Sequence, residues 1–157
     1  MSGYHWLLTL HVTGAFLLLA GSTIAGLLQL LALRTDRPSE IAQLLGLIRV
    51  ALPLVALGAV STLILGLWLV HHVGYSYGTF WVWGAVVGWV LGSGLGKVGG
   101  EKQKGARLLA ERLAGEGDTP SAELHSLLHD RKANAMSWAA GLAFYGVLAL
   151  MIWKPGQ

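Results

Sequence analysis

His11 is the side chain in this sequence with the most scope for chemistry. It lies inside the apolar run LLTLHVTGAFLLLAG, which contains no Asp, Glu, Lys or Arg. An ionisable residue within such a run is costly and marks a functional site by default.

Gly14, Ala15 and Leu18 share the helix face of His11, so a planar ligand has room beside the ring. Imidazole is a standard axial ligand of haem iron, and bundle cores hold such cofactors. His11 is therefore a candidate haem b ligand. The plainer interpretation is a neutral histidine hydrogen-bonded to a neighbouring helix.

Three further histidines lie near the ends of apolar runs. His71 and His72 follow the second run and are the candidates for a second haem ligand. Both lie nearer the surface than His11 and off the small-residue face of their helix, which argues against a deep His–His pair. A single ligand or a different partner stays open. Alternatively, His5, His71 and His72 meet at the surface, where three imidazoles would suit copper or zinc.

Long apolar stretches must position these histidines. The chain has 157 residues, of which 54% are hydrophobic and 12% charged, about half the charge of a soluble domain. Cysteine is absent, which excludes thiolate metal sites. A membrane span needs about 20 apolar residues, and four stretches are long enough. We predict a single all-α domain, a four-transmembrane-helix bundle with helices at about 6–33, 51–73, 80–114 and 120–153. The segment RTDRPSEIAQ is expected to form a turn and a short interfacial helix, with Pro53 near the start of the second span.

The distribution of charge predicts an orientation. Every Lys and Arg except Lys154 lies between Arg34 and Lys132, in the first and third connections. The positive-inside rule then places those connections in the cytoplasm and both termini outside, in a multi-pass protein of the cytoplasmic membrane. Tyr and Trp residues concentrate at the ends assigned to the outer face. Leucines at helical spacing predict that the third and fourth helices continue as a cytoplasmic hairpin. The basic residues are read as topology signals, so nucleic acid is not an expected partner.

The third span carries a glycine stripe with one glycine every four residues. Such a stripe lets two backbones approach closely and drives helix association in lipid. The partner is either another helix of this chain or a second protein, as a homo-oligomer or a larger membrane complex. The stripe consists of Gly84, Gly88, Gly92, Gly96 and Gly100.

Nearly the whole chain resembles a known family. The segments LLTLHVTGAFLLLAGSTIAG, ALRTDRPSEIAQLLGLIR, LGLWLVHHVGYSYG and LMIWKPG are similar to the DUF2269 family of predicted integral membrane proteins. More distantly, LHVTGA looks like the first helix of the CopD copper-resistance proteins and of the HemJ-type protoporphyrinogen oxidases. In HemJ-type proteins a histidine of this kind is linked to haem b, and that likeness extends only to His11. The basic residue within the HemJ bundle has no clear match here.

Three functions stay open at this point. The first is a haem-binding or redox membrane protein that uses His11. The second is a non-enzymatic accessory or assembly subunit that packs on a larger complex through its glycines. The third is copper or zinc handling by the surface histidines. The residues contain no nucleophile–base–acid arrangement that would predict a particular enzyme activity.

Overall fold

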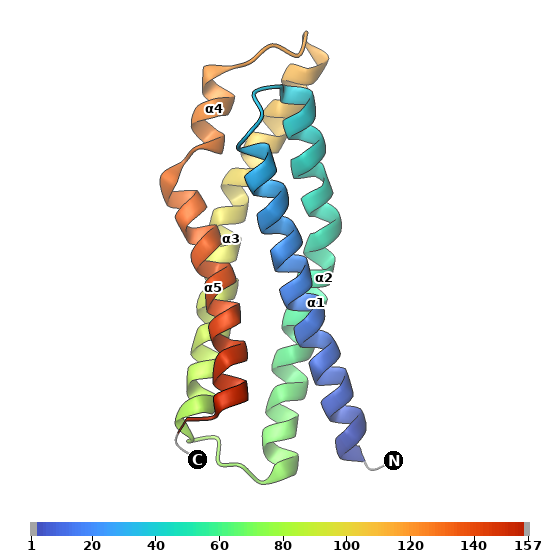
Figure 1. The fold of residues 1–157 in the computed structure, drawn as a ribbon, viewed down its shortest axis with the longest axis vertical. Coiled ribbons are helices and arrows are strands. Elements are labelled where there is room, and N and C mark those ends of the chain that lie inside the picture. Colours follow the sequence, from blue (N-terminus) through green and yellow to red (C-terminus); the bar gives the residue numbers. More distant parts are fainter. Residues whose placement is uncertain (1–2, 156–157) are drawn as a thin grey trace.

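The computed structural model describes residues 3–155, and over that range the protein is all-helical. The elements form one elongated bundle (Figure 1). Both chain ends and the α2–α3 connection lie at one end of it, which we call the terminal end. The α1–α2 connection and α4 lie at the other, the α4 end. The helices are α1 (Gly3–Ala32), α2 (Pro38–Val73), α3 (Phe80–Gly115), α4 (Ala122–Leu128) and α5 (Arg131–Trp153).

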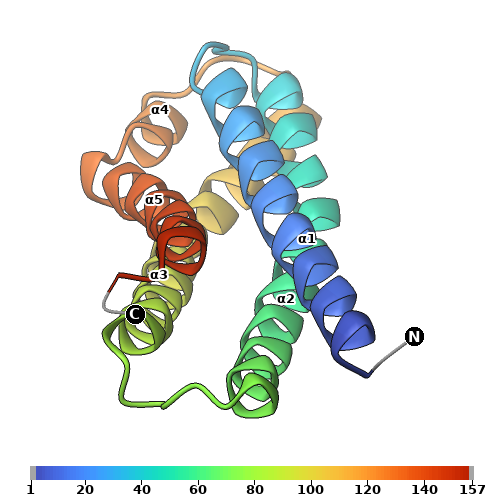
Figure 2. The same cartoon turned by 60° about the horizontal axis from the view of Figure 1, so that its bottom comes forward.

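The bundle is built from two helix pairs. α1 packs along α2 and α3 packs along α5, whereas contacts between the pairs are sparser. Figure 2 shows the two pairs diverging toward the terminal end. The α1–α2 crossing is close because Gly58 faces Gly14. A Cβ atom on Gly58 would come within 2.7 Å of the Gly14 carbonyl oxygen. Small residues of this kind are what lets membrane helices pack backbone to backbone.

Three segments among the described residues are long and apolar enough to cross a membrane: Gly3–Ala32, Pro38–Val73 and Ala122–Trp153. In lipid, backbone groups must be paired internally, which accounts for long helices in these runs. We expected α3 to be a fourth such segment. It has the same length as α2, 36 residues, but its glycine and tryptophan residues make it less hydrophobic than the other three.

The second helix begins at Pro38 rather than at the expected Ala51. No separate interfacial helix forms, since proline suits the first helical position and the helix runs on unbroken. The early turns are held by packing, because Ile41, Leu45 and Ile48 are buried together with residues of α3 and α4. Pro53 consequently lies inside the helix rather than near its start.

The expected helix over 120–153 is divided in two. α4 ends at Leu128 and α5 begins at Arg131. Asp130 lies between them, and its carboxylate accepts hydrogen bonds from the backbone N–H groups of Lys132 and Ala133, both at 3.0 Å. This N-cap satisfies the free donors of a new helix start. The short α4 then packs against α1, α2 and α3 through the buried residues Leu124 and Leu128.

Candidate functional site

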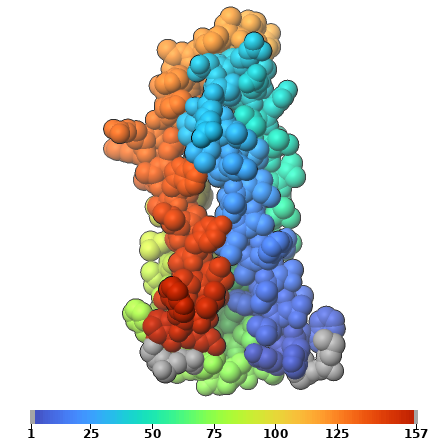
Figure 3. Space-filling view, in the orientation of Figure 1, coloured from blue at the N-terminus to red at the C-terminus, as the bar shows by residue number. Residues whose placement is uncertain are grey.

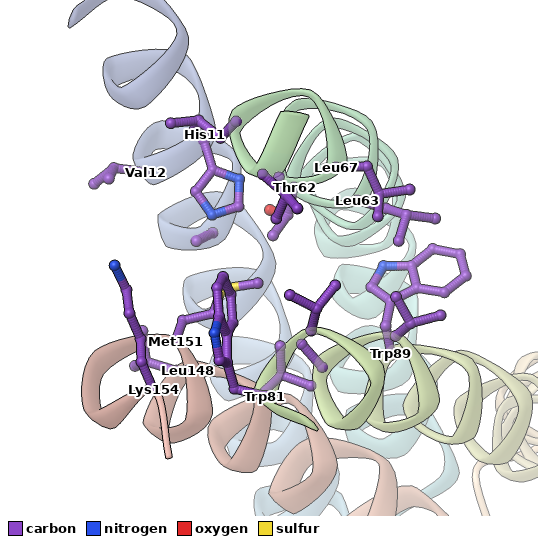
Figure 4. Close-up of a pocket in the computed structure, with 18 of the residues that line it drawn as sticks. His11, Val12, Thr62, Leu63, Leu67, Trp81, Trp89, Leu148, Met151 and Lys154 are labelled. Carbon is purple, nitrogen blue, oxygen red and sulfur yellow. The ribbon is translucent and has the colours of Figure 1, made fainter. Parts of the chain in front are cut away.

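A cavity of about 370 Å³ opens between the two helix pairs at the terminal end. Most of its wall is aliphatic, with contributions from α1, α2, α3 and α5. Residues with polar groups in the wall include His11, Thr62, Trp81 and Lys154, all labelled in Figure 4, together with Tyr4, Tyr75 and Trp89. We call it the His11 cavity. Few polar groups in an apolar wall are typical of small-molecule and cofactor sites.

His11 enters this cavity from α1 because the facing position on α2 is a glycine. A Cβ atom on Gly66 would lie 2.9 Å from Cε1 of His11 and 3.3 Å from Nδ1. The Cε1–Nδ1 edge of the imidazole therefore lies close against the α2 backbone. Nδ1 is directed to α2, toward the backbone of Thr62, while the other ring nitrogen, Nε2, points into the cavity (Figure 4).

Buried polar atoms without a hydrogen-bond partner cluster at this cavity. Within residues 3–155 three side-chain atoms are in this condition: Nδ1 of His11, Oγ1 of Thr62 and Nε1 of Trp81. All three residues line the His11 cavity. Since an unsatisfied buried polar group costs about 1–3 kcal/mol, such groups are few in native proteins. All three atoms belong to residues of one cavity wall, although Nδ1 of His11 itself faces α2, and this makes the cavity the candidate ligand site.

Lys154 places a cation at the mouth of the cavity. Lys154 Nζ lies 3.4 Å from the hydroxyl oxygen of Tyr75, 5.0 Å from the centroid of the Tyr75 ring and 5.7 Å from that of Trp81. Figure 3 shows a hollow in the surface between the last turns of α5 and the first turns of α1. The cavity thus faces the side of the bundle as well as its end.

An apolar plug closes the inner side of the cavity. Leu18, Ala59 and Phe144 are buried together, with Trp89 packed against them. The indole N–H of Trp89 donates to the Ala59 carbonyl at 2.9 Å. Beyond the plug lies a second cavity of about 440 Å³. It is lined by Gln29, whose amide donates to Oδ1 of Asn134 at 2.6 Å.

The other predicted histidines are not gathered into a site. His5, His71 and His72 are exposed. The ring of Tyr4 lies between two of them, 5.6 Å from His5 and 6.4 Å from His72, centroid to centroid. Over residues 3–155 no three His, Asp or Glu side chains lie close enough to hold a metal ion. His71 and His72 are also not among the residues that line the His11 cavity.

The glycine stripe of α3 lies against α5 of the same chain. Cβ atoms built on Gly84, Gly88 and Gly92 would meet Leu150 at 3.0 Å, Val147 at 2.7 Å and Phe144 at 2.8 Å. At Gly96 the neighbour is Ala140, at an ordinary 3.6 Å, whereas Gly100 has nothing within 4 Å. The stripe thus brings α5, with Lys154 at its end, close to α3.

The family model for DUF2269, described as predicted integral membrane protein, matches residues 5–155. The chain belongs to the DUF2269 family. It is therefore a predicted integral membrane protein over almost its whole length, in agreement with its apolar helices. No curated protein and no solved structure matches this DUF2269 chain.

Several residues of the site escaped the sequence analysis of this DUF2269 protein. Trp81 counted only as one of the Tyr and Trp residues at the outer ends of the helices, and Lys154 was noted only as the exception to the charge asymmetry. Met151 drew no attention, although it lines the cavity from α5 opposite His11 (Figure 4). The sequence offered one indication of their role, because Trp81 and Lys154 both lie at helix ends that were expected on the same side of the bundle.

Proposed function

We propose that this protein binds haem b in the His11 cavity, where Nε2 of His11 would hold the iron. The observation that carries the proposal is the orientation of the imidazole. Nε2 faces an apolar cavity while Nδ1 faces the α2 backbone. Ligating histidines generally use one ring nitrogen for the metal and direct the other at a carbonyl or carboxylate, which fixes the tautomer.

The residues around the imidazole suit a flat macrocycle. Ala15 and Gly66 flank the His11 ring without bulk, and aliphatic side chains with Trp81 and Trp89 complete the wall. The volume, about 370 Å³, is smaller than a whole haem, so the macrocycle would enter the cavity with one edge left at the mouth. When bound, haem supplies one-electron redox chemistry. The chain's own contribution is to hold the imidazole against α2 and to exclude water with apolar walls.

Met151 is the candidate for a second residue that would hold the haem iron. Its thioether lies in the cavity wall contributed by α5, whereas His11 belongs to α1. Methionine with histidine is an established axial pair that raises the reduction potential. Because no second histidine among residues 3–155 lines the cavity, a His–Met pair or a single histidine fits this chain better than the His–His pair considered from the sequence.

The test is the absorption spectrum of protein purified from haem-supplemented cells in mild detergent. The proposal predicts a Soret band in the wild type and its loss in His11→Ala. His5→Ala is the matched control, since His5 is an exposed histidine of the same helix, and it should keep the band. Wild-type protein that stays colourless under these conditions refutes the proposal.

The bundle is proposed to cross the cytoplasmic membrane four times, with α3 as the remaining span and both termini outside. All eight acidic residues and every basic residue except Lys154 lie between Arg34 and Lys132, which supports a cytoplasmic α4 end under the positive-inside rule. Because the chain has no cysteine, single cysteines at Ser76 and Thr119 can be labelled cleanly. An impermeant maleimide added to intact cells should label the first and spare the second, and the reverse pattern would overturn this topology.

The role of an accessory subunit has less support. It relied on the glycine stripe as a docking face, and Gly84, Gly88 and Gly92 are already occupied by α5 side chains. Metal handling by His5, His71 and His72 lacks a gathered ligand set within residues 3–155. Haem binding at His11 is therefore the function that the geometry favours.

A further inference from the structure

We infer that Lys154 is an anchor for the carboxylate of an amphipathic ligand, whose apolar body lies in the His11 cavity. The inference rests on the proposed function in its choice of ligand class, a porphyrin carrying acidic side chains. The inference adds Lys154 as the residue that recognises the acidic end of the ligand. Lys154 would therefore determine the orientation of the ligand in the cavity. The juxtaposition that carries the inference is the Lys154 ammonium, which has no ion-pair partner within residues 3–155, at the mouth of an apolar cavity.

Lys154 has no acidic side chain to pair with at its end of the bundle. Every Asp and Glu of the sequence falls between Asp36 and Asp130, whereas Lys154 follows the last turn of α5. Within residues 3–155 its ammonium donates one hydrogen bond, to the Tyr75 hydroxyl at 3.4 Å. A lysine ammonium has three donors. The ammonium therefore keeps capacity for an anion.

The position of Lys154 is held by its surroundings. Its backbone is left-handed, with φ of 41°, and its N–H donates to the Leu150 carbonyl at 2.9 Å. The ammonium lies 5.0 Å from the Tyr75 ring centroid and 5.7 Å from that of Trp81, within the range of cation–π attraction. An ordered cation at a partly apolar mouth loses less entropy on pairing than a free surface lysine does.

The same geometry defines the shape of the ligand. His11, Trp81 and Lys154 line one cavity but belong to three different helices. A ligand that satisfies all of them has an anionic edge at the mouth and a flat apolar body that reaches the imidazole. Haem has this form, with two propionates on one edge. The hollow between α1 and α5 seen in Figure 3 offers a side entry from the lipid.

The test uses iron-free protoporphyrin IX, so that binding does not depend on ligation by His11. Its fluorescence is titrated with full-length protein in a neutral detergent free of phospholipid. Lys154→Gln should weaken binding by about tenfold or more, the range of a lost charge-assisted hydrogen bond. Lys154→Arg should retain affinity. Lys132→Gln, at the opposite end of α5, is the matched control and should bind like the wild type.

A second arm uses protoporphyrin IX dimethyl ester, in which both carboxylates are blocked. The inference predicts that wild type and Lys154→Gln bind the diester equally. If Lys154→Gln lost affinity equally for the diacid and the diester, Lys154 would act through the fold and not by binding a carboxylate. Unchanged affinity of Lys154→Gln for the diacid would also overturn the inference. If added phosphatidylglycerol displaces the diacid from the wild type but not from Lys154→Gln, the cation serves a lipid phosphate instead, and the inference fails.

These outcomes are separable from those of the proposed function. Wild type that binds protoporphyrin IX through Lys154 but shows no iron ligation by His11 keeps the inference and refutes haem coordination. The opposite result is a His11-dependent Soret band in the wild type together with equal binding of protoporphyrin IX by wild type and Lys154→Gln. That result keeps haem coordination and refutes the inference about Lys154.

Discussion

The Cε1–Nδ1 edge of the His11 imidazole lies against Gly66, so that a Cβ atom at residue 66 would come within 2.9 Å of Cε1. This contact joins α1 to α2 at the depth of the cavity and fixes which ring nitrogen faces the ligand space. A glycine at residue 66 is thus part of the candidate site, although it supplies no side chain. The role of Gly66 can be tested without touching the histidine.

Gly66→Ala should displace the imidazole and weaken haem binding. Inserting a methyl group into a packed contact costs about 1–3 kcal/mol, which corresponds to a loss of affinity between about fivefold and about 150-fold. A haem titration followed at the Soret band measures this change. Gly46→Ala is the control on the same helix, because a Cβ there meets nothing within 4 Å. Equal affinities for the two variants would contradict the assigned contact.

Gly92→Leu should loosen the α3–α5 pair. A Cβ at residue 92 already lies 2.8 Å from Cε1 of Phe144, and a leucine needs more room than that. The melting temperature in detergent should fall, with a loss of stability of at least about 1–3 kcal/mol. Gly94→Leu, two residues along the same helix, points into open space and should leave the melting temperature nearly unchanged. Similar losses for both would mean that α3 does not pack on α5 through this face.

The hydrogen bond between Gln29 and Asn134 should couple α1 to α5. Its donor–acceptor distance is 2.6 Å, and Gln29 is buried. In membrane proteins such pairs average about 0.6 kcal/mol in double-mutant cycles, with a maximum of about 1.7 kcal/mol. The cycle Gln29→Ala, Asn134→Ala and the double variant, measured by unfolding in detergent, should give a coupling within that range. Strictly additive effects would show that the two amides do not interact.

The α4 end should loosen in acid. Asp118 accepts hydrogen bonds from the Ser39 hydroxyl and from the Ser39 backbone N–H, both at 2.7 Å. The Ser39 hydroxyl, with the backbone N–H second, lowers the pKa of Asp118 below its ordinary value, which is about 3.9. A carboxyl whose pKa is depressed on folding stabilises the fold above its unfolded pKa, and this stabilisation is lost as pH falls through the folded pKa.

Hydrogen exchange of the first turn of α2 measures this directly. Protection of that turn should be constant from pH 7 to about pH 5 and then decrease below about pH 4. Asp118→Asn removes the titrating charge and should abolish the pH dependence in this turn. A decrease of the same size in Asp118→Asn would assign the acid sensitivity to another group.

The long apolar runs made much of this fold predictable. Runs rich in Leu and Val can only be helical in lipid, and the small residues Gly14 and Gly58 indicate close helix crossings. The start of α2 was not predictable in the same way, because Pro38–Val50 is held by contacts with α3 and α4. The break at Asp130 depends on one side-chain cap that competes with a continuous leucine pattern.

The candidate site was only partly visible in the sequence. His11 is conspicuous because a titratable group in an apolar run needs an explanation. Trp81 and Lys154 become site residues only through the divergence of the two helix pairs at the terminal end, which no local pattern encodes (Figure 2). Conversely, His5, His71 and His72 share an end of the bundle without sharing a site, since their helix faces direct them outward.

The most direct test of the central claim is chemical rescue at residue 11. Haem b is titrated into purified His11→Gly protein with and without added imidazole, and the Soret band is recorded beside the wild type. Haem ligation by Nε2 predicts a ligated spectrum in the wild type, its loss in His11→Gly and its return when imidazole fills the vacated space. A His11→Gly protein that gives the wild-type spectrum without imidazole, or a wild type with no ligated spectrum, would contradict the claim.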